Sequence, residues 1–205
     1  MTLPIYSLLV TLLVTVSPLQ RSASPTIATE KILEAIGVRE GMTVCEMGAG
    51  DGELTVIAAK AVGSSGRVYS SELGEQRVKD LRARTGQSGV AHITVVEGAA
   101  EKTNFPEGGC DALFMRNVYH HFANPPAINA SILASLKPGA RAAVVDFTPP
   151  DKEAARPEDR GKDGTHGVAP ETVTRELTAV GLEAVSSEAG GDRWFLVVVR
   201  RPPSS

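Results

Sequence analysis

The stretch that most restricts the fold of this 205-residue chain is residues 44–55, Val-Cys-Glu-Met-Gly-Ala-Gly-Asp-Gly-Glu-Leu-Thr. A short apolar run ends, three glycines follow at alternate positions, and a helical pattern then begins. This order predicts a β-strand, a tight turn and a helix N-terminus. In α/β proteins ligands bind beyond the carboxyl ends of the strands, and glycine lets the backbone approach a ligand because it has no Cβ. We therefore expect a cofactor pocket at this turn, with a purely structural turn as the alternative.

Helix and strand patterns alternate from about residue 26 onward, which is typical of parallel strands joined by crossover helices. The predicted helices cover 27–36, 54–62, 75–84, a segment that starts at Asn124-Pro125, and 170–180. The predicted strands cover 43–47, 67–73, 92–96, 111–115, 142–147, 182–186 and 194–200. Gly190-Gly191-Asp192 is a hairpin signal between the last two strands, and Lys137-Pro138-Gly139 predicts a turn before the fifth. The chain is thus expected to be an α/β domain with seven strands.

The ends of the chain differ from this alternating region. Residues 1–24 contain no charged side chain before Arg21 and are mostly apolar from 3 to 19, which is the length of a signal-peptide core and short for a membrane span. A secretion signal, a membrane anchor, and a tail added by an upstream start codon all remain open. We expect one domain over 25–201, with a mobile loop at 149–167 and a disordered tail at 202–205.

Composition limits the classes of partner. The net charge is −3 and the basic residues are scattered, so the chain lacks the basic stripe of a nucleic-acid binder. Cys45 and Cys110 have no metal-ligand spacing, and no metal site is expected. Because the two residues fall at different heights on neighbouring predicted strands, we expect them to be buried thiols rather than a disulfide.

The glycine turn is not the dinucleotide-binding fingerprint, because Glu53 stands where that motif has a third glycine for close helix packing. The spacing Glu46-x-Gly48-x-Gly50-x-Gly52 instead resembles the first motif of the class I S-adenosylmethionine-dependent methyltransferases. Further segments resemble the family in the expected order: Glu72 at a strand end, 96–106 after the third strand, 110–122 at the fourth strand and its loop, and 136–146 leading through the fifth strand.

The resemblance implies a Rossmann-like, three-layer, doubly wound fold with a seven-stranded mixed sheet in the order 3-2-1-4-5-7-6, strand seven being antiparallel. It implies S-adenosyl-L-methionine as the cofactor, with Glu72 accepting hydrogen bonds from the ribose and the segment at Ala99 and Ala100 bracketing the adenine. The cofactor-binding residues carried over are Glu46, Gly48, Gly50, Gly52, Glu72, Ala99, Ala100 and Asn117. One departure is Ala99, where many relatives have Asp, so the backbone near Ala100 would have to contact the adenine amino group.

A methyl acceptor that must lose a proton needs a general base. The candidate catalytic residues are Tyr119, His120 and His121, which follow the fourth strand at the cofactor-facing edge, and His166, which lies in the loop 149–167. Histidine titrates near neutral pH and can accept such a proton. Asp146, at the end of the fifth strand, is expected to cap the loop.

Few residues are available for recognising a large substrate, since only the first helix and the loop 149–167 lie outside the common core. We therefore expect a methyltransferase that acts on a small molecule. The alternatives are a catalytically silent protein that binds the same cofactor, and an NAD- or nucleotide-binding module. Because S-adenosylmethionine is a cytosolic cofactor, a cytosolic domain is favoured over an exported one, whether or not residues 3–19 associate with a membrane.

Overall fold

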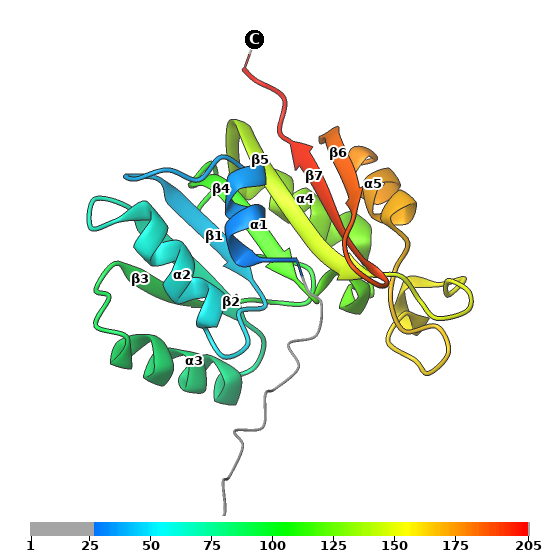
Figure 1. Cartoon of the computed structure of the whole chain (residues 1–205), viewed down its shortest axis with the longest axis horizontal. Coiled ribbons are helices and arrows are strands. Elements are labelled where there is room, and N and C mark those ends of the chain that lie inside the picture. Colours follow the sequence, from blue (N-terminus) through cyan, green and yellow to red (C-terminus); the bar gives the residue numbers. More distant parts are fainter. Residues whose placement is uncertain (1–26, 205) are drawn as a thin grey trace, which may run out of the picture.

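A computed structural model of the chain describes residues 27–204 and contains one seven-stranded sheet in the order β3-β2-β1-β4-β5-β7-β6 (Figure 1). The strands are β1 Thr43–Met47, β2 Arg67–Glu72, β3 Ile93–Glu97, β4 Cys110–Arg116, β5 Leu136–Phe147, β6 Glu183–Ala189 and β7 Trp194–Arg200. Strands β1 to β5 pair in parallel, and β7 is antiparallel to both β5 and β6. The predicted fold class, strand order and direction of the last strand are confirmed.

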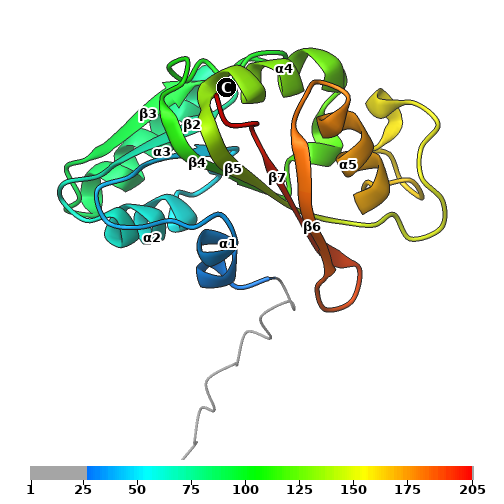
Figure 2. The ribbon, with the colours of Figure 1, turned by 90° about the horizontal axis from the view of Figure 1, so that it is seen from above.

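Helices cover both faces of the sheet, as the two views show (Figures 1 and 2). The helices α1 Thr29–Ala35, α2 Glu53–Val62 and α3 Glu75–Gln87 lie on one face, and α4 Pro125–Ser135 and α5 Pro170–Thr178 lie on the other. Two short 3-10 turns, η1 Tyr119–His121 and η2 Pro157–Asp159, complete the elements. Each face has its own apolar core, one around α1 and α2 and one around α4 and α5. This is the three-layer arrangement that burying both sheet faces requires.

The carboxyl ends of β1 to β5 meet at one edge of the sheet, and this edge carries the glycine turn. The predicted turn at Lys137-Pro138-Gly139 is absorbed into β5 as an irregularity: Leu136 pairs with Cys110, and the next pair joins Arg141 to Ala112. Gly139 still adopts a positive φ of 79° there, which a glycine tolerates without strain. The elements were thus predicted correctly and their ends were displaced by a few residues.

The expectation that Cys45 and Cys110 are free thiols is wrong, since the structure joins them in a buried disulfide with a Cα–Cα separation of 5.8 Å. The strand register does place Cys45 opposite Leu113, as the predicted offset requires. However, the strand pairing of β4 shifts between Cys110 and Ala112, so Cys110 does not continue the regular ladder. The predicted separation of the two cysteines assumed that β4 is regular along its whole length, and the irregularity at Cys110 makes that assumption invalid.

The structure gives the predicted mobile loop, 149–167, defined contacts. Glu153 accepts hydrogen bonds from the backbone N–H of Ala169 (3.0 Å) and from the Thr172 hydroxyl (2.8 Å), at the start of α5. Arg160 is buried and ion-pairs with Glu176 of α5. The loop, yellow to orange in Figure 1, is therefore fastened beside α5 at two places.

The predicted signal or anchor at 1–24, including the apolar run 3–19, lies outside the described residues. Between residues 27 and 204, none of the helices has the length and apolar character needed to cross a membrane. The residues 202–204 follow β7 without regular structure.

Candidate functional site

The carboxylate of Glu72 joins the end of β2 to the glycine turn that follows β1. Its Oε1 accepts a hydrogen bond from the backbone N–H of Gly50 (2.7 Å), and its Oε2 accepts one from Leu73 (3.0 Å). The side chain is only slightly exposed, and the Arg77 guanidinium lies 4.0 Å from Oε2. Two backbone N–H groups therefore fix the orientation of the Glu72 carboxylate beside the glycine turn.

The glycines of the turn have different roles. Gly48, Gly50 and Gly52 all have positive φ angles, of 66°, 56° and 78°. A Cβ on Gly48 would collide with the Val118 side chain, and one on Gly52 would lie 2.9 Å from Leu81 of α3. A Cβ on Gly50 would meet nothing within 4 Å. Gly48 and Gly52 therefore allow close packing, whereas Gly50 borders open space.

Glu46 lies one strand residue before the end of β1 and is buried. It accepts hydrogen bonds from the Thr55 hydroxyl and from the Ser70 hydroxyl (3.2 Å), and these two hydroxyls lie 2.8 Å apart. Burial raises the pKa of Glu46 to about 7, although both hydroxyls favour the charged form. The side chain therefore ties β1 to α2 and β2, and it titrates near neutral pH.

A cavity of about 600 Å³ opens along this edge of the sheet, from the end of β3 to the segment after β4. Of the predicted cofactor-binding residues, seven line it: Glu46, Gly48, Gly50, Glu72, Ala99, Ala100 and Asn117. Gly52 is the exception, since it packs against α3. At the other end the cavity wall includes Val118, His121, Phe122 and Ile128. The predicted cofactor residues thus gather around one space of the size of a small-molecule site.

The three consecutive residues of η1 point in different directions. His121 lines the cavity. Tyr119 is fully buried on the opposite side, where its hydroxyl donates to Glu176 (3.1 Å) and accepts from the Asn129 amide (2.7 Å). Burial raises the pKa of Tyr119 above its usual range. The structure places Tyr119 in the core against α4 and α5, away from the cavity.

His120 is buried and forms a chain of contacts with two side chains distant in sequence. Its Nδ1 lies 2.8 Å from Asp146 Oδ1, and its Nε2 lies 3.1 Å from Nε2 of His166. The His120 ring also packs against the His121 ring, which is tilted by 47°, with ring centroids 3.9 Å apart. Burial, reinforced by the neighbouring His120, lowers the pKa of His121. The structure therefore brings three of the four predicted catalytic residues together.

Several residues of the site were not predicted from the sequence. Asp146 was expected to cap the loop, and it does bond the backbone N–H of Phe147 (2.9 Å), but it also holds His120. Arg160 and Glu176, which fasten the loop, carried no signal because no periodicity or motif relates them. Thr55 and Ser70 are polar residues at positions that face the core, which was an available signal for a buried polar partner.

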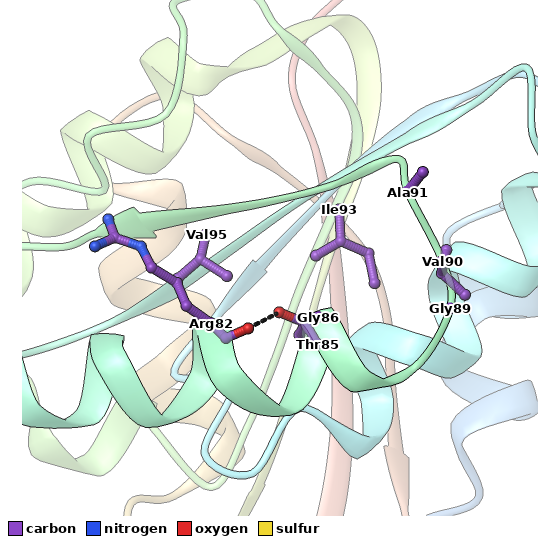
Figure 3. Close-up of a pocket in the computed structure, with 8 residues that line it drawn as sticks. All are labelled: Arg82, Thr85, Gly86, Gly89, Val90, Ala91, Ile93 and Val95. Atoms are coloured by element: carbon purple, nitrogen blue, oxygen red, sulfur yellow. Dashed lines mark hydrogen bonds between the residues drawn. The ribbon is translucent and has the colours of Figure 1, made fainter.

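A second hollow, of about 440 Å³, lies between α3 and β3 (Figure 3). Its wall carries one charged side chain, Arg82, together with small and apolar residues such as Gly86 and Ile93. The Thr85 hydroxyl is bonded back to its own helix, at Arg82 O (3.3 Å). No predicted site residue lines this hollow, and across residues 27–204 no cluster of His, Cys, Asp or Glu is placed to hold a metal ion.

Comparison with known proteins gives a family match over residues 45–144, to the family described as a methyltransferase domain. The ubiquinone/menaquinone biosynthesis C-methyltransferase UbiE of Shewanella pealeana is 30% identical over 125 residues, which are 60% of this chain and 50% of that protein. The chain therefore spans about half the length of the curated relatives it matches.

Solved structures share the fold. A SAM-dependent methyltransferase from Aquifex aeolicus superposes with a TM-score of 0.73 at 24% identity, covering 84% of this chain and 88% of the other. The [4+2]-cyclase SpnF superposes with a TM-score of 0.75 at 15% identity, covering 86% and 81%. At these identities the likeness is one of fold, and it extends over nearly all of the described residues.

Proposed function

Because the chain belongs to the class I S-adenosylmethionine-dependent methyltransferases, we propose that it transfers the methyl group of this cofactor to a small-molecule acceptor. The observation that carries the proposal is the pairing of Glu72 with the backbone of Gly50 beside the cavity. An anionic carboxylate at the end of β2 is suited to accept hydrogen bonds from ribose hydroxyls.

The residues around the cavity fit such a cofactor. The open space beside Gly50 leaves room for a ligand against the backbone, and the N-terminal end of α2 favours a carboxylate. The Glu72 carboxylate adds negative potential that suits an ammonium or sulfonium group. When bound, S-adenosylmethionine supplies an activated methyl group. The contribution of the chain is to align the acceptor with that group and to exclude water.

The acceptor end of the cavity favours an apolar or aromatic molecule. Its wall there is built from Val118, Phe122 and Ile128, with His121 as the polar group. Relatives that this chain matches over about half of their length are named as C-methyltransferases of ubiquinone and menaquinone biosynthesis. Both observations support a hydroquinone-type or phenolic acceptor, and no additional recognition domain lies within the described residues.

A second candidate function is cofactor binding without turnover. It is supported by Ala99, which lines the adenine-proximal end of the cavity but offers no side-chain acceptor. The likeness to a [4+2]-cyclase adds that this fold also occurs in a protein named for another reaction. Both candidate functions predict that the chain binds the cofactor, and only methyl transfer predicts turnover.

The test uses the full chain. Calorimetry with S-adenosylhomocysteine and with NAD measures affinity, and formation of S-adenosylhomocysteine from S-adenosylmethionine measures turnover on a panel of hydroquinones and phenols. We expect binding of S-adenosylhomocysteine, no binding of NAD, and turnover on at least one acceptor. Glu72→Ala should lower the affinity about 100-fold, as expected when a charged hydrogen-bond acceptor is removed.

Glu97→Ala is the matched control, because Glu97 ends β3 directly beside Glu72 in the sheet register and is exposed. It should leave the affinity unchanged. Tight binding with no turnover on any acceptor would favour the silent binding protein, and tighter binding of NAD would contradict both.

A further inference from the structure

We propose that His166, His120 and Asp146 form a proton relay in which His166 accepts the proton that the methyl acceptor releases. His166 is the catalytic residue of this relay, while His120 and Asp146 position and stabilise it. The inference rests on the proposed methyl transfer, and it narrows the acceptor to a group that loses a proton on methylation. A phenolic hydroxyl or a hydroquinone meets this condition, whereas a thioether or tertiary amine does not.

Asp146 fixes the orientation of the relay. Its Oδ1 is bonded to His120 Nδ1 (2.8 Å) and to the backbone N–H of Phe147 (2.9 Å), and its Oδ2 accepts from the backbone N–H of His120 (3.1 Å). This fully buried carboxylate accepts from two backbone N–H groups and meets His120 Nδ1 as a third partner. An ionised carboxylate only accepts hydrogen bonds, so Nδ1 of His120 carries the proton.

The tautomer of His120 then sets the tautomer of His166. A neutral His120 with a proton on Nδ1 has a lone pair on Nε2. This Nε2 lies 3.1 Å from Nε2 of His166, so the His166 nitrogen donates the hydrogen bond. The remaining nitrogen of His166, Nδ1, is left with the lone pair. The base of the relay is therefore this Nδ1, on an exposed residue.

The relay lies beside the wall of the cavity, next to His121. The His120 ring contacts the ring of His121, which lines the cavity, at a tilt and that of His166 edge-on. The ring centroids of His121 and His166 are 6.4 Å apart. Phe147 packs edge-on against His166 at 5.1 Å and forms an apolar floor beside it. In the sheet order β5 lies beyond β4, so the relay is at the opposite end from Glu72 on β2.

Other charged groups face the relay from the elements packed around it. His121 lies beside it on η1, Asp146 is on β5, and the guanidinium of Arg193 lies over the Phe147 ring at 5.3 Å. Arg77 of α3 acts on His121 from across the cavity. Within the relay, Asp146 is the carboxylate bonded to His120, so it compensates the positive charge that His166 gains.

The proposed step balances as follows. The lone pair of the acceptor oxygen, or a π electron pair of an acceptor ring carbon, forms the new bond to the methyl carbon. The bond from the methyl carbon to sulfur breaks, and sulfur keeps its electron pair. The acceptor's proton moves to Nδ1 of His166. The resulting imidazolium donates through Nε2 to His120, which donates through Nδ1 to Asp146, and the proton later leaves to solvent from exposed His166. No oxidant or reductant is consumed.

The relay is tested first without any acceptor, by nitrogen-15 NMR of the histidine rings in the full chain. The chain has four histidines, and His92 serves as the internal reference because its Nε2 is bonded to the Ala59 carbonyl in another part of the fold. We expect His120 with its proton on Nδ1 and His166 with its proton on Nε2. A His120 protonated on Nε2 in its neutral form would overturn the relay.

The second arm measures kcat and KM against pH, with a hydroquinone or phenol from the panel on which the wild type turns over. His166→Gln should lower kcat about 100-fold, the loss typical of a missing general base, with KM changed less than threefold and the acidic limb of the profile removed. Added imidazole should restore part of the rate of His166→Ala. Asp146→Asn should lower kcat similarly, provided that it folds.

His92→Gln is the matched control and should keep the wild-type kcat and pH profile. An unchanged kcat and pH profile in His166→Gln would overturn the relay, as would a loss of S-adenosylhomocysteine affinity in this variant. Failure of the proposed function has a different signature, since the wild type would then turn over no acceptor, and the NMR arm alone would decide the arrangement of the histidines.

Discussion

The two ends of the cavity are built in different ways. At the end proposed to hold the cofactor, here called the cofactor end, most lining groups come from residues 46–100. Backbone hydrogen bonds such as that from Gly50 to Glu72 hold them. At the acceptor end, side chains from η1, β5 and the loop 149–167 hold one another, as His120 does with Asp146 and His166. Backbone geometry thus dominates one end, and buried charges and imidazoles dominate the other.

This difference determines which substitutions each end of the cavity tolerates. A site built from backbone N–H groups depends on φ angles and on the absence of Cβ atoms, so it is damaged by adding atoms. A site built from charged side chains is damaged by removing one partner, because the other is left buried without compensation. The following predictions apply one kind of damage at a time, in order of decreasing effect on stability.

The largest effect is expected from the disulfide beneath the cofactor end. The Cys45–Cys110 bond closes a segment with a sequence separation of 65, and opening it should lower the free energy of unfolding by about 4 kcal/mol. Urea unfolding of Cys45→Ala/Cys110→Ala measures this loss, with the reduced wild type as a second measurement. If the double variant matches the oxidised wild type, the covalent link does not stabilise the cofactor end.

The next effect concerns the buried carboxyl of Glu46. Its pKa rises from 4.5 to about 7 on folding, so the folded chain holds a proton that the unfolded chain releases. The stabilisation of the folded chain by protonated Glu46 is fully present below pH 4.5 and is lost as the pH rises to 7. The free energy of unfolding should therefore fall by about 3 kcal/mol over this pH range. Unfolding midpoints at several pH values measure it, and Glu46→Gln should remove this part of the pH dependence.

Removing one charge at the acceptor end comes third. Glu176→Gln leaves the buried Arg160 guanidinium without its anion and should lower the free energy of unfolding by about 2 kcal/mol, below the usual range for buried pairs because Glu176 is partly exposed. Turnover should fall while S-adenosylhomocysteine affinity is kept. The control is Glu158→Gln, whose partner Arg156 is exposed, with an expected change of about 0.5 kcal/mol or less. Equal effects of the two variants would contradict the proposed anchoring of the loop.

The smallest effect on stability is expected from Gly50→Ala. The residue keeps a φ of 56°, which costs a non-glycine residue about 1 kcal/mol. The added methyl group enters cavity space, so the affinity for S-adenosylhomocysteine should fall more than the stability does. Gly86→Ala, inside α3 with no atom within 4 Å of the new Cβ, should instead raise stability by about 0.5 kcal/mol. Calorimetry and thermal unfolding separate the two effects.

The cofactor end was predictable from the sequence because its signals are local. The glycine spacing at 48–52 and the acid at 72 each follow a strand, and strand ends of a parallel sheet meet at one edge. The sheet order, by contrast, was predicted from the family resemblance and not from these local signals. Of the predicted cofactor residues, Gly52 is the one that does not line the cavity, because its lack of a Cβ serves packing against Leu81.

The acceptor end was predictable only in part. His120, His121 and His166 were named as candidates, but the contact of His166 with His120 joins residues 46 positions apart, and no periodicity specifies such a contact. Tyr119 could not be distinguished from its neighbours, because a 3-10 turn directs consecutive side chains to different sides. The disulfide was missed for a related reason, since an irregularity in β4 cannot be read from an apolar run.

The position of the disulfide has a consequence for limited proteolysis. The bond between Cys45 and Cys110 makes a covalent ring that contains α2, β2, α3 and β3, and with them Glu72 and the glycine turn. His120, Asp146 and His166 all lie outside this ring. A protease that cuts within the ring leaves its two fragments joined until a reductant is added, whereas a cut in the loop 149–167 releases the C-terminal fragment from any covalent link. Gels run with and without reductant therefore tell which end of the cavity was cut.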